Sequence, residues 1–232
     1  MTTISANLQA VNQRIVAACA QAGRAPGLVN LLAVSKTWPE SAVRAAAGAG
    51  QVAFGESYVQ EALPKMAALA ELSLQWHFIG PLQSNKTRPV AERFDWVHSI
   101  ERLKIAERLS AQRPEHLPPL NVCVEVNVSG EASKSGCTPA EVPALCRAVA
   151  ALPRLRLRGL MAIPEPMSDE KSALVKRHFA AVRALQEKLV AEGLPLDTLS
   201  MGMSHDLEAA IMEGATIVRV GTAIFGERNY ST

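Results

Sequence analysis

One lysine of the sequence lies where its amine could act as a nucleophile. Leu32, Val34 and Lys36 alternate along a short apolar run, so they share one face of a predicted strand that ends before Trp38. Apolar neighbours disfavour the charged ammonium and favour the neutral amine that attacks an aldehyde. The run therefore predicts a lysine that forms a Schiff base, and the competing interpretation is a surface lysine at a strand end.

Two segments near the carboxyl end contain residue types that bind phosphate. Residues 199–204 end a predicted strand and lead into a helix with Ser204 as its expected N-cap, and Gly221 and Thr222 follow the last predicted strand. Glycines let the backbone approach a ligand closely, hydroxyls donate hydrogen bonds, and a helix N-terminus has a partial positive charge. We expect a phosphate group between these segments. The alternative is that the same residues only form turns.

Arg219 is predicted to point inward from the last strand, because Val218 and Val220 occupy the opposite face. A guanidinium keeps its proton, so a ring nitrogen beside it must accept a hydrogen bond. An aldehyde, a ring nitrogen and a phosphate occur together in pyridoxal 5′-phosphate (PLP), which is the cofactor that these residues indicate. The alternative role for Arg219 is a buried ion pair with Glu125 or another acid.

These residues need a fold that brings the ends of several strands together. After an amphipathic first helix over residues 1–23, short apolar runs alternate with helical patterns up to the carboxyl end. The predicted strands are residues 31–36, 51–55, 74–80, 96–99, 120–128, 157–163, 198–201 and 216–221. The further predicted helices are residues 39–49, 60–72, 100–112, 139–152, 171–192 and 204–213.

Strict alternation of strands and helices predicts parallel strands with right-handed crossovers. In a chain of 232 residues this favours a single domain over residues 1–232, a closed (β/α)8 TIM barrel with an extra N-terminal helix. An open doubly wound sheet is the alternative, but both faces of such a sheet are usually apolar. Between residues 122 and 128, valines occupy one face and Cys123, Glu125 and Asn127 the other, which favours the barrel.

Composition and charge exclude several classes of protein. The chain has 24 Lys and Arg against 22 Asp and Glu, a net charge of +2, so we expect no nucleic acid partner. It has neither an apolar run long enough for a membrane span nor the pattern of a signal peptide, so we expect a cytoplasmic protein without membrane contact. Its cysteines and histidines lack ligand spacing, so we expect reduced thiols and no bound metal.

Five segments of the sequence resemble a known family in their order along the chain. They are LAVSK at residues 32–36, FGESYVQE at 54–61, WHFIGPLQSNK at 76–86, GLMAI at 159–163, and residues 199–226. These segments are similar to the YggS/PROSC family of pyridoxal phosphate homeostasis proteins. The resemblance implies a barrel of the alanine racemase N-terminal type.

The resemblance also implies roles for single residues. Lys36 would form the internal aldimine with PLP, and Arg219 would lie near the pyridine nitrogen. The residues that match the positions holding the phosphate end are Ser200, Met201, Gly221 and Thr222. Where the family usually has asparagine this chain has Ser57, whose contact with the cofactor or its lysine would be weaker or bridged by water.

The resemblance implies a PLP carrier and regulator in vitamin B6 homeostasis, without robust catalysis and with indirect effects on amino-acid and keto-acid balance. Its expected recipients are apo forms of PLP-dependent enzymes, and the expected state is a monomer, with a weak dimer as the alternative. A competing function is a PLP-dependent amino-acid racemase. Racemases of this fold take a second base, a tyrosine, from an added β-domain, whereas this chain ends after its eighth predicted strand and contains only Tyr58 and Tyr230. A third candidate is a barrel enzyme without a cofactor, in which Lys36 forms a Schiff base with a sugar phosphate.

Overall fold

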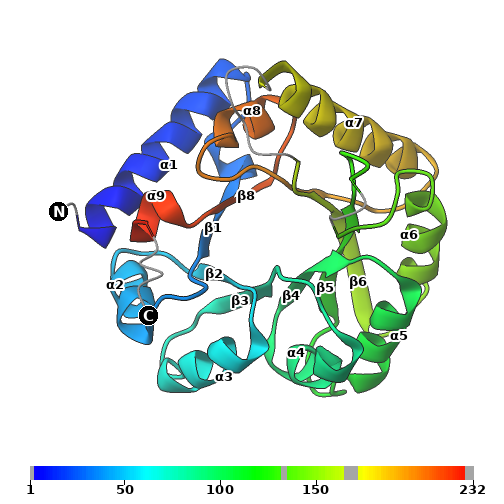
Figure 1. Ribbon diagram of the computed structural model, residues 1–232, viewed down its shortest axis with the longest axis horizontal. Coiled ribbons are helices and arrows are strands. Elements are labelled where there is room, and N and C mark those ends of the chain that lie inside the picture. The colour runs from blue at the N-terminus through cyan, green and yellow to red at the C-terminus, as the bar shows by residue number, and fades with distance from the viewer. Residues whose placement is uncertain (1–2, 132–134, 165–171, 228–232) are drawn as a thin grey trace.

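Within the residues that the structure describes, 3–131, 135–164 and 172–227 of this computed structural model, eight parallel strands close into a barrel (Figure 1). Each strand pairs with the next along the chain, and β8 pairs with β1. The strands are β1 Asn30–Val34, β2 Ala53–Glu56, β3 Gln75–Phe78, β4 Trp96–Ile100, β5 Leu120–Val126, β6 Leu155–Ala162, β7 Thr198–Ser200 and β8 Ile217–Val220. The predicted TIM barrel is confirmed, and the open sheet is wrong.

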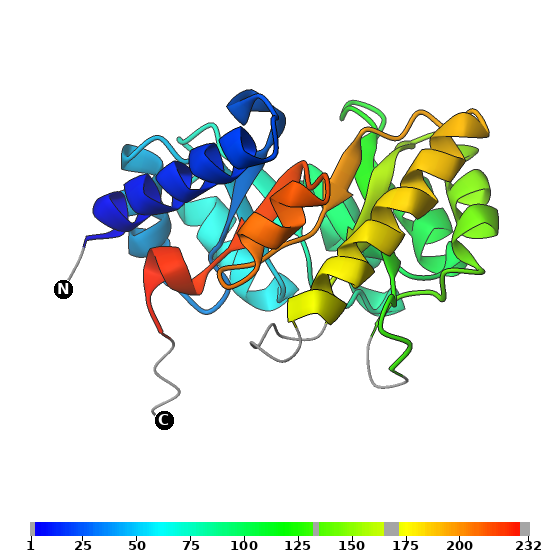
Figure 2. The same cartoon turned by 90° about the horizontal axis from the view of Figure 1, so that it is seen from above.

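Helices surround the barrel (Figures 1 and 2). They are α1 Ile4–Gln21, α2 Glu40–Gly48, α3 Val59–Ala68, α4 Thr87–Arg93, α5 Leu103–Gln112, α6 Val142–Ala150, α7 Ser172–Ala191, α8 Leu207–Met212 and α9 Thr222–Phe225, with 3-10 turns η1 Pro26–Leu28 and η2 Ser84–Lys86. The sequence did not predict α4 and α9, because helices of 7 and 4 residues are too short to show a helical period. The start of the predicted helix 171–192 at residue 171 lies outside the described residues.

The extra N-terminal helix α1 packs against the last two helices, α8 and α9. Its buried residues Leu8, Val11, Ile15 and Cys19 recur every three or four positions, as the sequence predicted. Helix α1 lies along α8 and α9 in both views (Figures 1 and 2), so it covers the side of the barrel where β8 meets β1. No helix of the described residues is long and apolar enough to cross a membrane.

Alternation along the strands divides the core into two layers. The valines of β5 join the large cluster between strands and helices, whereas Cys123 belongs to the smaller cluster inside the barrel. On β8, Val218 packs outward and Ile217 inward, so Arg219 also points inward. This is the pattern that period-two alternation predicts for barrel strands.

Candidate functional site

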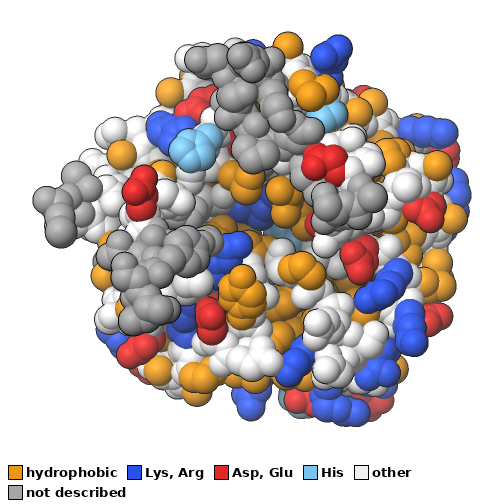
Figure 3. Space-filling model, viewed as in Figure 1, with side chains coloured by type: hydrophobic (Ala, Val, Ile, Leu, Met, Phe, Trp, Pro, Cys, Tyr) orange, Lys and Arg blue, Asp and Glu red, His pale blue; other side chains and the backbone are white. Residues whose placement is uncertain are grey.

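A cavity of about 200 Å³ opens at the carboxyl ends of the strands. Its lining residues come from β1, from β8 and from the segments that follow β1, β2, β3, β6, β7 and β8: Val34, Lys36, Ser57, Ile79, Ile163, Met203, Ser204, His205, Arg219, Gly221 and Thr222. Figure 3, which views this end of the barrel, shows a hollow near the centre of the face with basic and hydrophobic side chains around it. The cavity is small beside the roughly 300–1,000 Å³ of typical ligand pockets, so it suits a small ligand.

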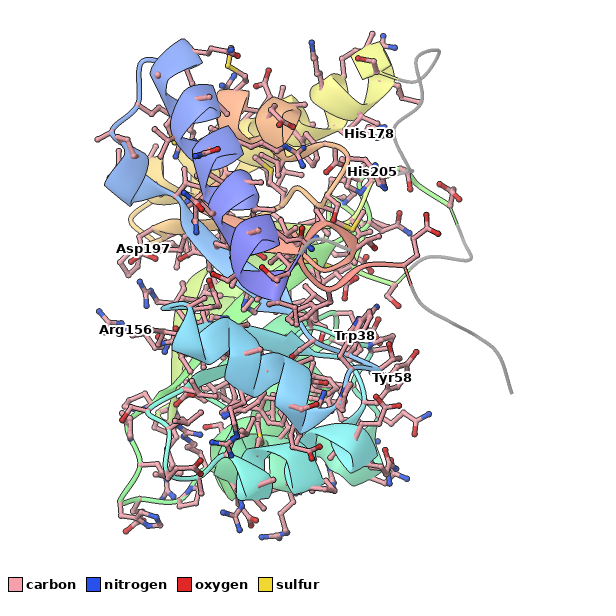
Figure 4. All side chains as sticks on the ribbon, turned by 90° about the vertical axis from the view of Figure 1, so that its left-hand side faces the viewer. Trp38, Tyr58, Arg156, His178, Asp197 and His205 are labelled. Carbon is pink, nitrogen blue, oxygen red and sulfur yellow. The ribbon has the colours of Figure 1, made fainter. Side chains whose placement is uncertain are left out.

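The charge of the lining favours an anion. Lys36, Arg219 and His205 line the cavity, and none of its lining residues in the described part of the chain is a carboxylate. His205 lies at the same end of the molecule as Trp38 and Tyr58, far from Arg156 and Asp197 at the opposite end (Figure 4). Cations and hydroxyls in a partly enclosed space form charge-assisted hydrogen bonds with phosphate oxygens.

Lys36 lies in a tight turn directly after β1. The amide of Trp38 donates a hydrogen bond to the carbonyl of Ser35 at 3.1 Å, which closes the turn around the half-buried Lys36. Thr37 has a φ of 70°, a left-handed conformation that a β-branched residue rarely adopts. Its amide donates to Oε2 of Glu61 on α3 at 3.1 Å, so contacts from outside the turn stabilise its strained backbone.

A buried ion pair lies beneath this turn. Nζ of Lys65 lies 2.6 Å from Oε1 of Glu56 and donates to the carbonyl of Ser35 at 2.9 Å. The Ser35 hydroxyl donates to the same Glu56 oxygen at 2.6 Å. Burial raises the pKa of the Glu56 carboxyl, and the nearby Lys65 ammonium opposes that rise. Ser35, the neighbour of Lys36, is therefore held by both its main chain and its side chain.

Arg219 is buried with its guanidinium bonded to the barrel. Nη1 donates to the main-chain carbonyl of Ser200 and, at 2.8 Å, to its hydroxyl, and Nη2 donates to the carbonyl of Ala162 at 3.0 Å. Burial lowers the pKa of Arg219 to about 10, so it stays protonated at neutral pH. Among the described residues it forms no salt bridge with Glu125 or another acid, so the predicted alternative of a direct ion pair is wrong. Burial raises the pKa of Glu125 to about 7, and the attraction of Arg219 opposes this.

The segment after β7 lines the cavity with Met203, Ser204 and His205, and not with the predicted Ser200 and Met201. Asp206 precedes α8 and its Oδ1 accepts a hydrogen bond from the Met203 amide, so the prediction of Ser204 as N-cap is wrong. Gly202 has a φ of 95°, and a Cβ there would lie 2.5 Å from Cβ of Ala210. Only glycine fits this turn, which brings Met203 and Ser204 to the cavity wall.

Ser200 and Met201 are not lining residues of the cavity. Ser200 is fully buried behind Arg219, and Met201 packs into the core between strands and helices. The Met201 amide donates to the carbonyl of Ile217 at 3.1 Å, so it is used by the strand pair. The structure therefore does not place these two residues where they could hold a phosphate directly. It brings together Lys36 with Ser57, Arg219, Gly221 and Thr222.

Four lining residues were missed by the sequence analysis: Ile79, Ile163, Met203 and His205. Ile79 and Ile163 directly follow β3 and β6, and all four lie inside segments that resemble the family. Their position after strands of a barrel was the signal that would have found them.

The closed barrel and a basic cavity at its carboxyl end define a domain of the alanine racemase N-terminal type. The family described as alanine racemase, N-terminal domain, matches residues 6–229. An alanine racemase of Corynebacterium glutamicum is similar in fold alone, with a TM-score of 0.69 and 19% identity over 97% of this chain and 62% of that one.

Two nearer relatives narrow the family. A pyridoxal phosphate homeostasis protein of Pseudomonas aeruginosa is 63% identical over 99% of this chain and 98% of its own. PipY of Synechococcus elongatus, whose structure was solved with PLP bound, is 37% identical with a TM-score of 0.83, covering 97% of this chain and all of that one. The chain belongs to the family of pyridoxal phosphate homeostasis proteins, as its five segments indicated.

Proposed function

We propose that this protein binds PLP in the cavity and acts in vitamin B6 homeostasis as a carrier and regulator of the cofactor. The observation that supports this best is the meeting of Lys36, Arg219 and the hydroxyl and glycine residues of two loops in one small cavity. An amine, a ring-nitrogen donor and a phosphate site are the three groups that PLP needs. The name of the Pseudomonas relative and the PLP bound to PipY support the same ligand.

Five of the lining residues then have direct roles in binding. When bound, PLP supplies an aldehyde that condenses reversibly with an amine and releases water, and Lys36 is the amine. Arg219 donates an N–H to the ring nitrogen. Ser204, Gly221 and Thr222 bind the phosphate, and the Ala223 amide donates to Oγ of Ser204 at 3.4 Å, which joins the two loops. Ser200 supports Arg219 from behind, and Met201 shapes the core.

The same residues argue against robust catalysis. Because Arg219 remains protonated, it cannot stabilise a proton on the ring nitrogen, and an unprotonated ring is a poor electron sink. Tyr58 is half exposed and is not a lining residue of the cavity, so the described residues offer no tyrosine as a second base. The cofactor is thus stored and released rather than used for turnover.

Racemase and transaminase rates are expected at background for the common amino acids. The measurement is a coupled assay with each amino acid, with Lys36→Ala protein as the blank. A turnover of even about 1 s⁻¹ that disappears in the blank would replace the carrier by the competing racemase-like enzyme, since this is an ordinary enzymatic rate.

Pyridoxal without its phosphate is expected to bind at least about tenfold more weakly than PLP, because one charge-assisted hydrogen bond contributes about 1.5–3 kcal/mol. Titration of the purified protein with each compound, followed by absorbance, measures both affinities. Ser204→Ala should weaken PLP more than pyridoxal. Equal affinities would contradict a phosphate site at Ser204, Gly221 and Thr222, and the lack of any spectral change with PLP would overturn the proposed function.

Ser57→Asn is expected to tighten PLP binding about two- to twelvefold, because one added hydrogen bond contributes about 0.5–1.5 kcal/mol. A serine at this position could also cap the following helix, but Ser57 lines the cavity and α3 begins after Tyr58 without a side-chain cap. Ser57→Ala serves as the matched control. Dissociation constants that are the same for the asparagine variant and the parent would remove Ser57 from the site.

We further propose a cytoplasmic monomer, formed by one domain, that delivers PLP to apo enzymes and contacts neither nucleic acid nor membrane. The small net charge supports the last two statements. Sedimentation at several concentrations tests the monomer against a weak dimer. Transfer of PLP to an apo transaminase, at a rate that depends on the concentration of this protein, tests the delivery.

A further inference from the structure

A chain of hydrogen bonds crosses the barrel interior and ends on Arg219. His77 on β3 and His98 on β4 are 3% and 0% exposed, and Nδ1 of His77 lies 2.9 Å from Nε2 of His98. Nδ1 of His98 lies 2.7 Å from the hydroxyl of Ser200, which also accepts from Arg219 at 2.8 Å. At the far end, Nε2 of His77 lies 3.0 Å from Oε1 of Gln75.

This series of hydrogen bonds joins the two mouths of the barrel. Gln75 is exposed at the start of β3, where it lines a second cavity of about 440 Å³ together with His77 and Trp96. Arg219 lines the candidate cofactor cavity at the other mouth. Strands β3 and β4 are neighbours, whereas Ser200 and Arg219 come from β7 and β8 on the other side of the barrel (Figure 1).

The donors and acceptors of this chain can be ordered in one direction. Burial lowers the pKa of His77 to about 3 and that of His98 well below its usual value, so both rings are neutral with one donor and one acceptor each. Because Oε1 of Gln75 only accepts, Nε2 of His77 donates and its Nδ1 accepts from Nε2 of His98. Nδ1 of His98 then accepts from the Ser200 hydroxyl, which leaves the oxygen lone pairs for Arg219.

This order matters for the orientation of the guanidinium. Three of the five N–H groups of Arg219 donate to Ser200 and Ala162. The other two form no hydrogen bond within the described residues, and Arg219 lines the cavity, so they are available to a ligand there. If the Ser200 O–H pointed toward Arg219, two donors would face each other, and the hydrogen bond from Nη1 of Arg219 to this hydroxyl would be lost.

We propose that His98 and His77 are positioning residues for Arg219, holding its guanidinium through Ser200 in the orientation that meets the ring of the bound cofactor. The inference rests on the proposed role of Arg219 in PLP binding. In this role the two histidines do not contact the ligand. The hydrogen bonds between them also explain how two imidazoles can be buried, since buried polar groups lower the stability of the fold unless each has a hydrogen-bond partner.

The first test measures the tautomers of the apo protein by two-dimensional ¹⁵N NMR of the imidazole rings. Both His77 and His98 are expected to be neutral at pH 7 with the proton on Nε2. A proton on Nδ1 of either ring, or a charged ring, would overturn the proposed direction of the chain. This NMR measurement does not depend on PLP binding.

The second test changes Gln75, the exposed end of the hydrogen-bond series, which lies at the barrel mouth opposite the cofactor cavity. Gln75→Leu removes the acceptor and Gln75→Glu keeps one, while Asn30→Ala alters an exposed residue at the same mouth as a control. Affinity is measured for PLP and for 4′-deoxypyridoxine 5′-phosphate, which lacks the aldehyde but keeps the ring nitrogen. Gln75→Leu is expected to weaken both ligands about twofold or more, and the other two variants to bind as the parent does.

His98→Ala is expected to weaken both ligands about two- to twelvefold, the equivalent of one hydrogen bond. If this buried variant does not fold, Gln75→Leu decides the result. Wild-type protein that binds neither ligand would overturn the proposed function. Wild-type protein that binds both, with folded His98→Ala or Gln75→Leu binding as tightly, would overturn the positioning role alone.

Discussion

Lys36→Ala protein is expected to lose the absorbance band of lysine-bound PLP completely. The reason is placement, because Lys36 is the lysine that lines the cavity with Arg219, in a turn whose neighbour Ser35 is held from below. The same protein should unfold within about 1 kcal/mol of the parent, because a half-buried side chain in a turn contributes little packing. Absorbance after addition of PLP and urea unfolding measure the two quantities.

Borohydride reduction and peptide mapping identify the modified residue. In the parent protein the label is expected on Lys36 alone. Lys86→Ala is the matched control, since η2 lies outside the cavity lining, and it should keep the full band. A label on Lys86 or Lys134 of the parent would show that the reactive lysine had been assigned wrongly.

Lys65→Met is expected to destabilise the fold by about 3–5 kcal/mol, the effect of leaving a buried charge without its partner. The side chains of Lys65 and Glu56 are 6% and 0% exposed, and Oε2 of Glu56 already lacks a hydrogen-bond partner within the described residues. The measurement is the free energy of unfolding in urea at pH 7. The double variant Lys65→Met with Glu56→Met should recover most of the loss, because it removes both charges.

Arg44→Met provides a matched control for this effect. Arg44 pairs with Glu71 at the surface, where both side chains are about half exposed, and an exposed pair contributes about 0–1 kcal/mol. A loss for Lys65→Met no larger than that for Arg44→Met would contradict the view that the buried pair stabilises the turn that contains Lys36.

The loss in Lys65→Met should also depend on pH. Without the ammonium, burial acts on the Glu56 carboxyl with mainly the Ser35 hydrogen bond to oppose it, so its pKa in the folded state rises further above the unfolded value. Between these two values the folded state binds more protons than the unfolded state, so stability falls as pH rises through that window. The deficit against the parent is therefore expected to shrink toward acidic pH. A deficit that is constant from pH 4 to 7 would mean that the loss of Lys65 leaves the pKa of Glu56 in the folded state unchanged.

The sequence by itself determined the barrel and most of the residues around its cavity. Alternation along β5 and β8 separated an outward face from an inward one, because side chains in a strand alternate whatever surrounds them. Lys36, Gly221 and Thr222 could be grouped without coordinates, since parallel strands in a closed barrel all end at the same mouth. Arg219 was assigned to the interior for the same reason.

Only the tertiary structure decided what lies behind those residues. Ser200 bonds to Arg219 and Met201 packs into the outer core, so neither lines the cavity, and no local pattern records how far along the chain the cavity wall begins. Glu56 pairs with Lys65, and His98 with Ser200. In each pair the two residues lie on different elements, so no helical or strand repeat in the sequence indicates their contact. Their contacts depend on the stagger of the closed barrel and on which inward side chains meet across it, and both arise only when all eight strands have packed together.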